Sequence, residues 1–232
     1  MSTMIPITLE KEWLTCLNLL PTFTPLLTRT LVLSPHPDDE TLGAGGLINH
    51  LRRKNVPVEI VAVTNGERAY PNFTELGTLR IEEQNQAASF LGVEEANIHR
   101  LNFPDSDVAE FKSSLEYSLE KLIDSQTHVI APWIGDFHPD HEIVGQVAQE
   151  IAFRKKASIS FYFFWMWHRG TPDLINSLNL YSFPLSPEEN TAKHLAIECH
   201  QSQLSHPSQE PILPEYLLSP LYRPFEVYVH ND

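Results

Sequence analysis

Short apolar runs alternate with longer amphipathic segments along most of this chain, and this order constrains its fold more than any other feature. The runs are rich in Val, Ile and Leu, and residues typical of turns bound them. They predict strands at Thr30–Ser34, Val58–Thr64, Ile98–Leu101, His128–Pro132, Phe161–Trp167 and Phe225–Val229. Apolar strands that alternate with helices are typical of a mostly parallel sheet covered on both faces. The expected fold class is therefore α/β and Rossmann-like.

Helical spacing of apolar residues predicts the helices between these strands. They are expected over residues 9–20, 41–54, 78–91, 108–122 and 141–153, and after Ser186, which begins a capping box. A chain of 232 residues is long enough for one well-buried core, so we expect a single domain over residues 1–232. Residues 1–28 would form an N-terminal helical extension. Residues 204–232, which include Pro207, would form a C-terminal loop followed by the last strand.

The charge and the termini exclude several classes of partner. The formal net charge of −14 repels phosphate backbones and anionic membrane surfaces, so we expect no nucleic-acid partner and no membrane partner. Cys16 and Cys199 form no zinc-binding or disulfide pattern. The first residues, Met1–Pro6, lack the pattern of a signal peptide, and the longest apolar run is too short to span a bilayer. A cytoplasmic protein is expected; the oligomeric state stays open.

The first predicted strand runs directly into Pro35–Glu40 (PHPDDE). Ligands of an open parallel sheet bind at the carboxyl ends of its strands, so the position of this segment is informative. The adjacent carboxylates of Asp38, Asp39 and Glu40 repel one another unless a cation lies nearby. The segment therefore favours a bound metal, although such a turn also occurs as a simple helix cap.

A second segment, Asp136–His141 (DFHPDH), follows the strand at His128–Pro132. His138 and His141 are three residues apart and can face the same way at the start of a helix. Imidazole and carboxylate groups suit zinc, and a catalytic zinc needs three protein ligands and an open position for water. Because both segments follow strands at one edge of the sheet, we expect them to meet there.

Pro35–Glu40 paired with His138–His141 (HPDH) resembles the LmbE-like (PIG-L) N-acetylglucosaminyl de-N-acetylase family. Thr64–Glu67 (TNGE) is similar to the T-x-G-E turn of that family, and Arg80 with Glu83 matches its following helix. The resemblance covers the chain from the first predicted strand to the last.

The resemblance implies one zinc ion per chain, held by His36, Asp39 and His141, with ferrous iron as the alternative. It also implies Asp38 as the base. This agrees with the chemistry of the metal, because zinc lowers the pKa of its bound water to near neutrality and polarises an amide carbonyl.

The same resemblance assigns His138 to polarising the carbonyl or donating a proton, and we expect Asp140 to hold its ring. Some members of the family have a tyrosine just before this segment, where the present chain has Asp136 and Phe137. Either more of the stabilisation of the oxyanion would then fall on His138, or another residue would substitute for the tyrosine.

Several residues have two interpretations that the sequence leaves open. Glu40 either orients His36 or only suits the dipole of a helix. Glu67 and Arg80 are expected to contact substrate, but Arg80 could instead only pair with Glu83 one helical turn away. Some aromatic residues either stack on a sugar or belong to the core, and two C-terminal segments either close over the pocket or form solvated loop. These are Trp133, Phe137, Trp165, Trp167, and residues 200–203 and 223–226.

The expected function is that of a zinc-dependent hydrolase, which acts on a linear amide bond and removes an N-acetyl group from an N-acetylglucosamine-like substrate. The partner would be a small amino sugar or a glycoconjugate. One alternative is a metal-dependent amidase acting on a non-sugar amide or a thiol-sugar conjugate. Another is a sugar-binding protein without catalysis, because a fold can outlive its function.

Overall fold

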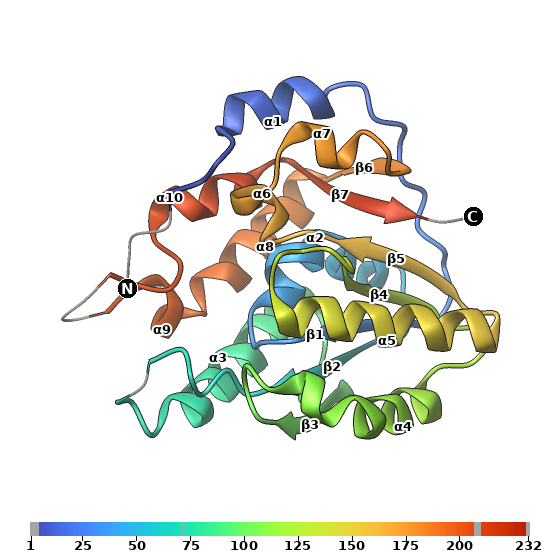
Figure 1. Ribbon diagram of the computed structural model, residues 1–232. Coiled ribbons are helices and arrows are strands. Elements are labelled where there is room, and N and C mark those ends of the chain that lie inside the picture. The colour runs from blue at the N-terminus through green and yellow to red at the C-terminus, as the bar shows by residue number, and fades with distance from the viewer. Residues whose placement is uncertain (1–4, 71, 207–209, 231–232) are drawn as a thin grey trace.

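The computed structural model describes residues 5–70, 72–206 and 210–230, and these residues form a seven-stranded sheet (Figure 1). The strand order is β3-β2-β1-β4-β5-β7-β6. The strands are β1 (Thr30–Ser34), β2 (Val58–Thr64), β3 (Ile98–Phe103), β4 (His128–Pro132), β5 (Ser158–Tyr162), β6 (Leu180–Pro184) and β7 (Phe225–His230). Strands β1 to β5 are parallel, and β7 runs antiparallel to both β5 and β6. The predicted fold class is confirmed.

Helices connect the strands and cover the sheet. The larger ones are α1 (Glu10–Leu17), α2 (Asp39–Arg53), α3 (Leu76–Leu91), α4 (Lys112–Leu122), α5 (Pro139–Lys155) and α8 (Pro187–Glu198). Short helices are α6 (Met166–Arg169), α7 (Pro172–Ile175), α9 (Gln201–Leu204) and α10 (Glu215–Leu218), and 3₁₀ turns are η1 (Glu95–Asn97), η2 (Val108–Phe111) and η3 (Ser219–Tyr222). The capping box predicted at Ser186 is present at the start of α8.

The core lies in two main layers, one on each face of the sheet, and a third, smaller cluster contains Leu42, Phe164 and Leu213. Helices lie on both faces of the sheet (Figure 1). Leu31 and Leu33 of β1 pack with residues of α1, α4, α5 and α7, whereas Val32 faces α2, α3 and α8. Successive residues of a strand point to opposite faces, so a strand covered on both sides reads as one continuous apolar run. Helix α1 belongs to the first layer, because Trp13 is fully buried and its indole donates to the carbonyl oxygen of Trp167 at 2.9 Å.

Most predicted elements lie where the sequence placed them, with three exceptions. The bounds predicted for the strand Phe161–Trp167 are wrong, because β5 covers Ser158–Tyr162 and α6 begins at Met166 within the same apolar run. Strand β6 was not predicted. The expected C-terminal loop contains the short helices α9 and α10, while Pro207 lies outside the described residues.

Within the described part of the chain, no helix combines the length and the apolar character needed to cross a bilayer. Residues 1–4, on which the expectation about a signal peptide partly rests, lie outside that part.

Candidate active site

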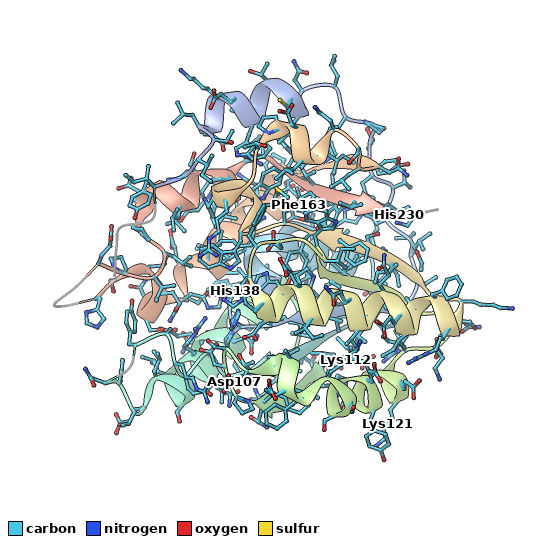
Figure 2. The ribbon with its side chains drawn as sticks, in the orientation of Figure 1. Asp107, Lys112, Lys121, His138, Phe163 and His230 are labelled. Carbon is cyan, nitrogen blue, oxygen red and sulfur yellow. The ribbon has the colours of Figure 1, made fainter. Side chains whose placement is uncertain are left out.

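The two histidine-containing segments meet at the centre of the carboxyl edge of the sheet. Strand β1 precedes the first and β4 precedes the second, and these strands are parallel neighbours. The chain leaves β1 toward β2 on one side and returns to β4 on the other, so this is the point where the strand order reverses. Ligands of open α/β sheets bind at such a point. Figure 2 shows His138 here, at the N-terminal end of α5.

The three predicted metal ligands lie together. The Oδ2 atom of Asp39 is 3.2 Å from Nδ1 of His36 and 3.2 Å from Nε2 of His141. Ligands bound at 2.0–2.2 Å in a tetrahedral arrangement are roughly 3.3 Å apart, so this spacing fits a zinc ion. Nε2 of His141 is buried and makes no hydrogen bond with the described residues. That orphaned nitrogen, beside a carboxylate, is the kind of donor that a metal satisfies.

The electrostatics of this cluster also favour a cation. Burial lowers the pKa of His141, but the carboxylates of Asp39 and Asp136 outweigh burial and raise it to about 9. Burial also lowers the pKa of His36. Hydrogen bonds to the carboxylates of Asp105, Asp140 and Asp39 outweigh burial, so that this pKa lies well above its ordinary value. A site that holds protons this strongly is one in which a metal ion can replace them.

Asp136 orients His141, a role that the sequence analysis missed. Its carboxylate accepts from Nδ1 of the His141 ring at 2.9 Å and from the backbone N–H groups of Phe164, Trp165 and Met166. A carboxylate behind a ligating histidine fixes the tautomer that presents the other nitrogen to the metal. The signal was available, since Asp136 lies in the loop between β4, which ends at Pro132, and α5, five residues before His141.

The expectation that Asp140 holds the ring of His138 is wrong. The Oδ2 atom of Asp140 is 3.1 Å from Nε2 of His36, and the carboxylate accepts backbone N–H groups of Ser106 and Val108. Among the described residues, the one hydrogen bond to the His138 ring comes from the backbone N–H of Asp140, at 3.3 Å. The carboxylate points away because it lies in the first turn of α5, where it faces the loop after β3. Asp140 therefore orients His36, one of the predicted metal ligands.

Asp105 is the second carboxylate on His36, and the sequence analysis also missed it. Its Oδ1 is 3.3 Å from Nε2 of His36, and its pKa is lowered, because hydrogen bonding to His36 outweighs burial. The backbone N–H of Asp105 donates to Oε1 of Glu67 at 3.0 Å. Glu67, expected at the substrate, instead positions this loop and does not line the cavity. A carboxylate just after β3 was the only signal for Asp105.

Asp38 lies in the wall of a cavity of about 750 Å³ and contacts Arg80. Burial raises the pKa of Asp38 to about 7, and the guanidinium of Arg80 opposes that rise. A carboxylate with a pKa near neutrality is suited to accept and return a proton. The position of Asp38 thus matches the role that the resemblance implies.

Arg80 pairs with Asp38 rather than with Glu83, so the simpler of its two interpretations is wrong. Its Nη2 is 3.1 Å from Oδ2 of Asp38, and Nη1 donates to the carbonyl oxygen of Gly66. Glu83 instead accepts from the backbone N–H and the hydroxyl of Ser202. Arg80 lines the cavity, but its exposed fraction is only 3%.

Glu40 does not orient His36. Its carboxylate accepts from the hydroxyl of Ser34 at 2.5 Å and from the amide of Gln84 at 3.1 Å. These contacts tie the start of α2 to the end of β1 and to α3. Of the two interpretations of Glu40, orientation of His36 is wrong, and the favourable interaction with the helix dipole stays a prediction for this residue of the first turn of α2.

His138 is neutral in this arrangement. Burial, and secondarily the positive charge of His36 and His141, lowers its pKa to about 3. Nδ1 accepts the backbone N–H of Asp140, so the proton of the neutral ring lies on Nε2. Such a ring donates a hydrogen bond without carrying a charge. This favours polarisation of the substrate carbonyl by His138 over donation of a proton.

Besides these polar side chains, the cavity is lined by a group of apolar residues. Ile212, Leu213 and Leu217 from the C-terminal segment belong to this group, and so does Trp165. Trp167 is buried in the core, and Trp133 packs against that core. Trp133, Phe137 and Trp167 do not line the cavity. Of the four aromatic candidates, Trp165 alone is placed to contact a substrate.

The C-terminal segments 200–203 and 223–226 are not solvated loops. His200 and Gln203 are fully buried, and Arg223 and Glu226 are nearly so. The carbonyl oxygen of Gln203 accepts the N–H of Leu213, which lines the cavity. The first segment therefore supports the cavity wall from behind.

Fold and site together define an α/β protein with a histidine and aspartate cluster, suited to a metal, at the carboxyl edge of its sheet. The model of the PIG-L family, described as GlcNAc-PI de-N-acetylase, matches residues 31–152, just over half of the chain. This chain belongs to the PIG-L family.

Among its relatives is 1D-myo-inositol 2-acetamido-2-deoxy-alpha-D-glucopyranoside deacetylase of Mycobacterium sp. (strain KMS), 31% identical over 52% of this chain and 49% of that protein. Diacetylchitobiose deacetylase of Thermococcus kodakarensis is 30% identical over 50% of this chain and 46% of that protein. The chain thus spans about half the length of these relatives.

Solved structures share the fold. N,N'-diacetylchitobiose deacetylase from Pyrococcus horikoshii has a TM-score of 0.63 at 24% identity, over 84% of this chain and 75% of that one. The A40926 pseudoaglycone deacetylase has a TM-score of 0.67 at 18% identity, over 88% of this chain and 97% of that one. At these identities the likeness extends to the fold alone.

Proposed function

We propose that this chain is a zinc-dependent hydrolase that removes an N-acetyl group from an N-acetylglucosamine-like amino sugar or glycoconjugate. Membership of the PIG-L family supports this class of reaction. The names of the relatives, which are deacetylases of acetamido sugars, support the substrate class. The observation that carries the proposal is the buried Asp38 in the cavity wall, adjacent in sequence to the ligand Asp39.

His36, Asp39 and His141 would hold the zinc ion, with Asp136 and Asp140 orienting the two rings. A bound zinc ion supplies an activated water and polarises the amide carbonyl of the substrate. The remaining steps belong to side chains of this chain.

Asp38 accepts the proton of the water as the water oxygen bonds to the amide carbon. Nε2–H of His138 donates a hydrogen bond to the carbonyl oxygen, on which negative charge develops. Asp38 then returns the proton to the nitrogen as the carbon–nitrogen bond breaks, which releases acetate and the free amine. Arg80 holds Asp38 in place through the ion pair at 3.1 Å.

The first test combines elemental analysis of the purified protein with assays of amine and acetate release. N-acetylglucosamine and diacetylchitobiose are the probes, before chelation, after chelation, and after zinc is restored to one equivalent per chain. Excess zinc is avoided because one structural neighbour is named as a zinc-inhibited form. Iron in place of zinc in the purified protein would correct the identity of the metal.

We expect equimolar amine and acetate, lost on chelation and restored by zinc. Release of a larger acid from an acylated amine would indicate the amidase instead. A zinc-loaded protein that binds these sugars and releases no amine from them would contradict the proposal in favour of a binding protein.

A further inference from the structure

Phe137, the residue before His138, has a backbone conformation that needs support. Its φ is 59°, in the left-handed region that bulky residues rarely adopt. Its side chain is 36% exposed, so packing of the ring does little to impose this conformation. The residue lies between Asp136, which backbone N–H groups anchor, and the start of α5. Something other than the Phe137 side chain must hold its peptide in place.

Arg169, the last residue of α6, makes that contact. Its Nη1 donates to the carbonyl oxygen of Phe137 at 2.7 Å. This oxygen belongs to the peptide that joins Phe137 to His138, so the hydrogen bond fixes the orientation of that peptide. Hydrogen bonds from a charged donor are stronger than those between neutral groups.

The same guanidinium also contacts the ring against which His138 stacks. The Cζ atom of Arg169 is 4.6 Å from the centroid of the Trp165 ring. The rings of Trp165 and His138 are stacked, with centroids 5.8 Å apart and planes inclined by 17°. Arg169 therefore contacts two of the groups that support His138, the peptide before it and the indole beside its ring.

The other two arginines that line the cavity use their charge differently. Arg68 pairs with Asp107, and Arg80 pairs with Asp38. Arg169 makes no ion pair with any residue in the described part of the chain. Its contacts with the carbonyl oxygen and the indole are therefore its principal interactions there.

We propose that Arg169 is a positioning residue, which acts through Phe137 and Trp165 to aim Nε2–H of His138 at the reacting carbonyl. This inference rests on the proposed function, which gives His138 its role. Without Arg169, the backbone of Phe137 is free to relax out of the left-handed region, and the His138 ring loses its direction. Small misplacements of a catalytic group cost up to about a hundredfold in rate.

The kinetic test is a double-mutant cycle of Arg169→Ala and His138→Ala, each protein loaded with zinc. Arg169→Ala should lower kcat by about tenfold to a hundredfold, with KM changed less than about threefold. Arg169→Lys, which keeps a charged donor, should recover part of the loss. In the His138→Ala background, Arg169→Ala should have no further effect. Arg154→Ala removes an exposed arginine of α5 that pairs with Glu120 and should leave kcat unchanged.

Multiplying losses in the double variant, or a rise in KM at constant kcat, would overturn the proposal, because Arg169 would then act independently of His138 or bind substrate directly. Zinc content and the unfolding midpoint of each variant report on folding separately.

A crystal structure of zinc-loaded Arg169→Ala provides a readout that does not depend on activity. We expect Phe137 to leave the left-handed region, or the His138 ring to leave the Trp165 face. An unchanged Phe137 and His138 would contradict the positioning role, even if wild-type protein proved inactive. An inactive wild type with the expected displacement would instead refute the proposed function and retain the structural role of Arg169.

Discussion

The two turns that build the site contain the same tripeptide, His-Pro-Asp, at residues 36–38 and 138–140. The tripeptide has a different position relative to the following helix in each turn. In the first turn, residues 36–38 end just before α2 begins at Asp39. In the second turn, only His138 precedes the helix, and Pro139 and Asp140 already belong to α5. The two aspartates of this shared motif therefore occupy different structural positions.

This difference in position separates their tasks. Asp38 lies outside its helix and faces the cavity beside His36 and Asp39, two of the proposed metal ligands. Asp140 lies in the first turn of its helix and faces the backbone N–H groups of Ser106 and Val108 and the ring of His36. The comparison teaches that a motif specifies which groups are available, while the start of the helix decides where each group points.

The largest expected effect separates the two histidines of the second turn. His141→Ala removes a proposed ligand, so bound zinc should fall from one per chain to near zero and amine release should be lost. His138→Ala should lower the rate while zinc stays near one per chain. Elemental analysis after gel filtration checks both variants. Loss of zinc from His138→Ala would instead show that His138 is a ligand. The geometry permits this, because ring nitrogens of His36, His138 and His141 lie within 4.8 Å of one another.

The next effect compares the two aspartates of the shared motif. Asp38→Asn should lower kcat on the order of a hundredfold to ten-thousandfold, with zinc affinity nearly unchanged, because an amide cannot accept the proton. Steady-state kinetics on diacetylchitobiose, together with zinc analysis, measure this. A non-catalytic sugar-binding protein would keep both its ligand affinity and its function in this variant, and full turnover in Asp38→Asn would remove the role of base from Asp38.

A smaller effect concerns the carboxylates behind the ligating rings. Asp136→Asn and Asp140→Asn should each weaken zinc affinity by about tenfold to a hundredfold, because each carboxylate orients one ligand. Competition with a chromogenic chelator measures the affinity. Glu40→Gln is the matched control, since its carboxylate contacts Ser34 and Gln84 and no metal ligand. Equal affinities in Asp140→Asn and Glu40→Gln would show that Asp140 does not act through His36.

The smallest effect concerns the support of Asp38. Gly66 has a φ of 60°, and a Cβ atom there would lie 2.1 Å from Nη1 of Arg80. Gly66→Ala should therefore lower the free energy of unfolding by about 1–3 kcal/mol, measured by denaturant titration. Gly66→Asn shares the clash but tolerates positive φ, so it separates the two causes. If Gly66→Asn is as stable as wild type, the loss of stability in Gly66→Ala comes from backbone strain. If Gly66→Ala is itself as stable as wild type, the side chain of Arg80 moves to make room for the Cβ atom.

The secondary structure was predictable wherever local signals agreed. The limits of β1, β2 and β4 match the predicted ones because each is a buried apolar run between turn residues. The run through Phe161–Trp167 fits a strand and a helix equally well, and only the tertiary context ends β5 at Tyr162. Strand β6 is partly exposed, and its place is set by antiparallel pairing with the distant β7. Such a pairing leaves no local signal.

The sequence by itself determined which chemical groups the site contains, because motif residues that follow adjacent parallel strands must meet at one edge of the sheet. The tertiary structure alone decided which carboxylate serves which ring. Asp140 reaches His36 across 104 residues of sequence, and Arg80 reaches Asp38 across 42. These contacts depend on where each helix begins and how the loops after β2 and β3 pack. Since those are properties of the folded chain, no local pattern encodes them.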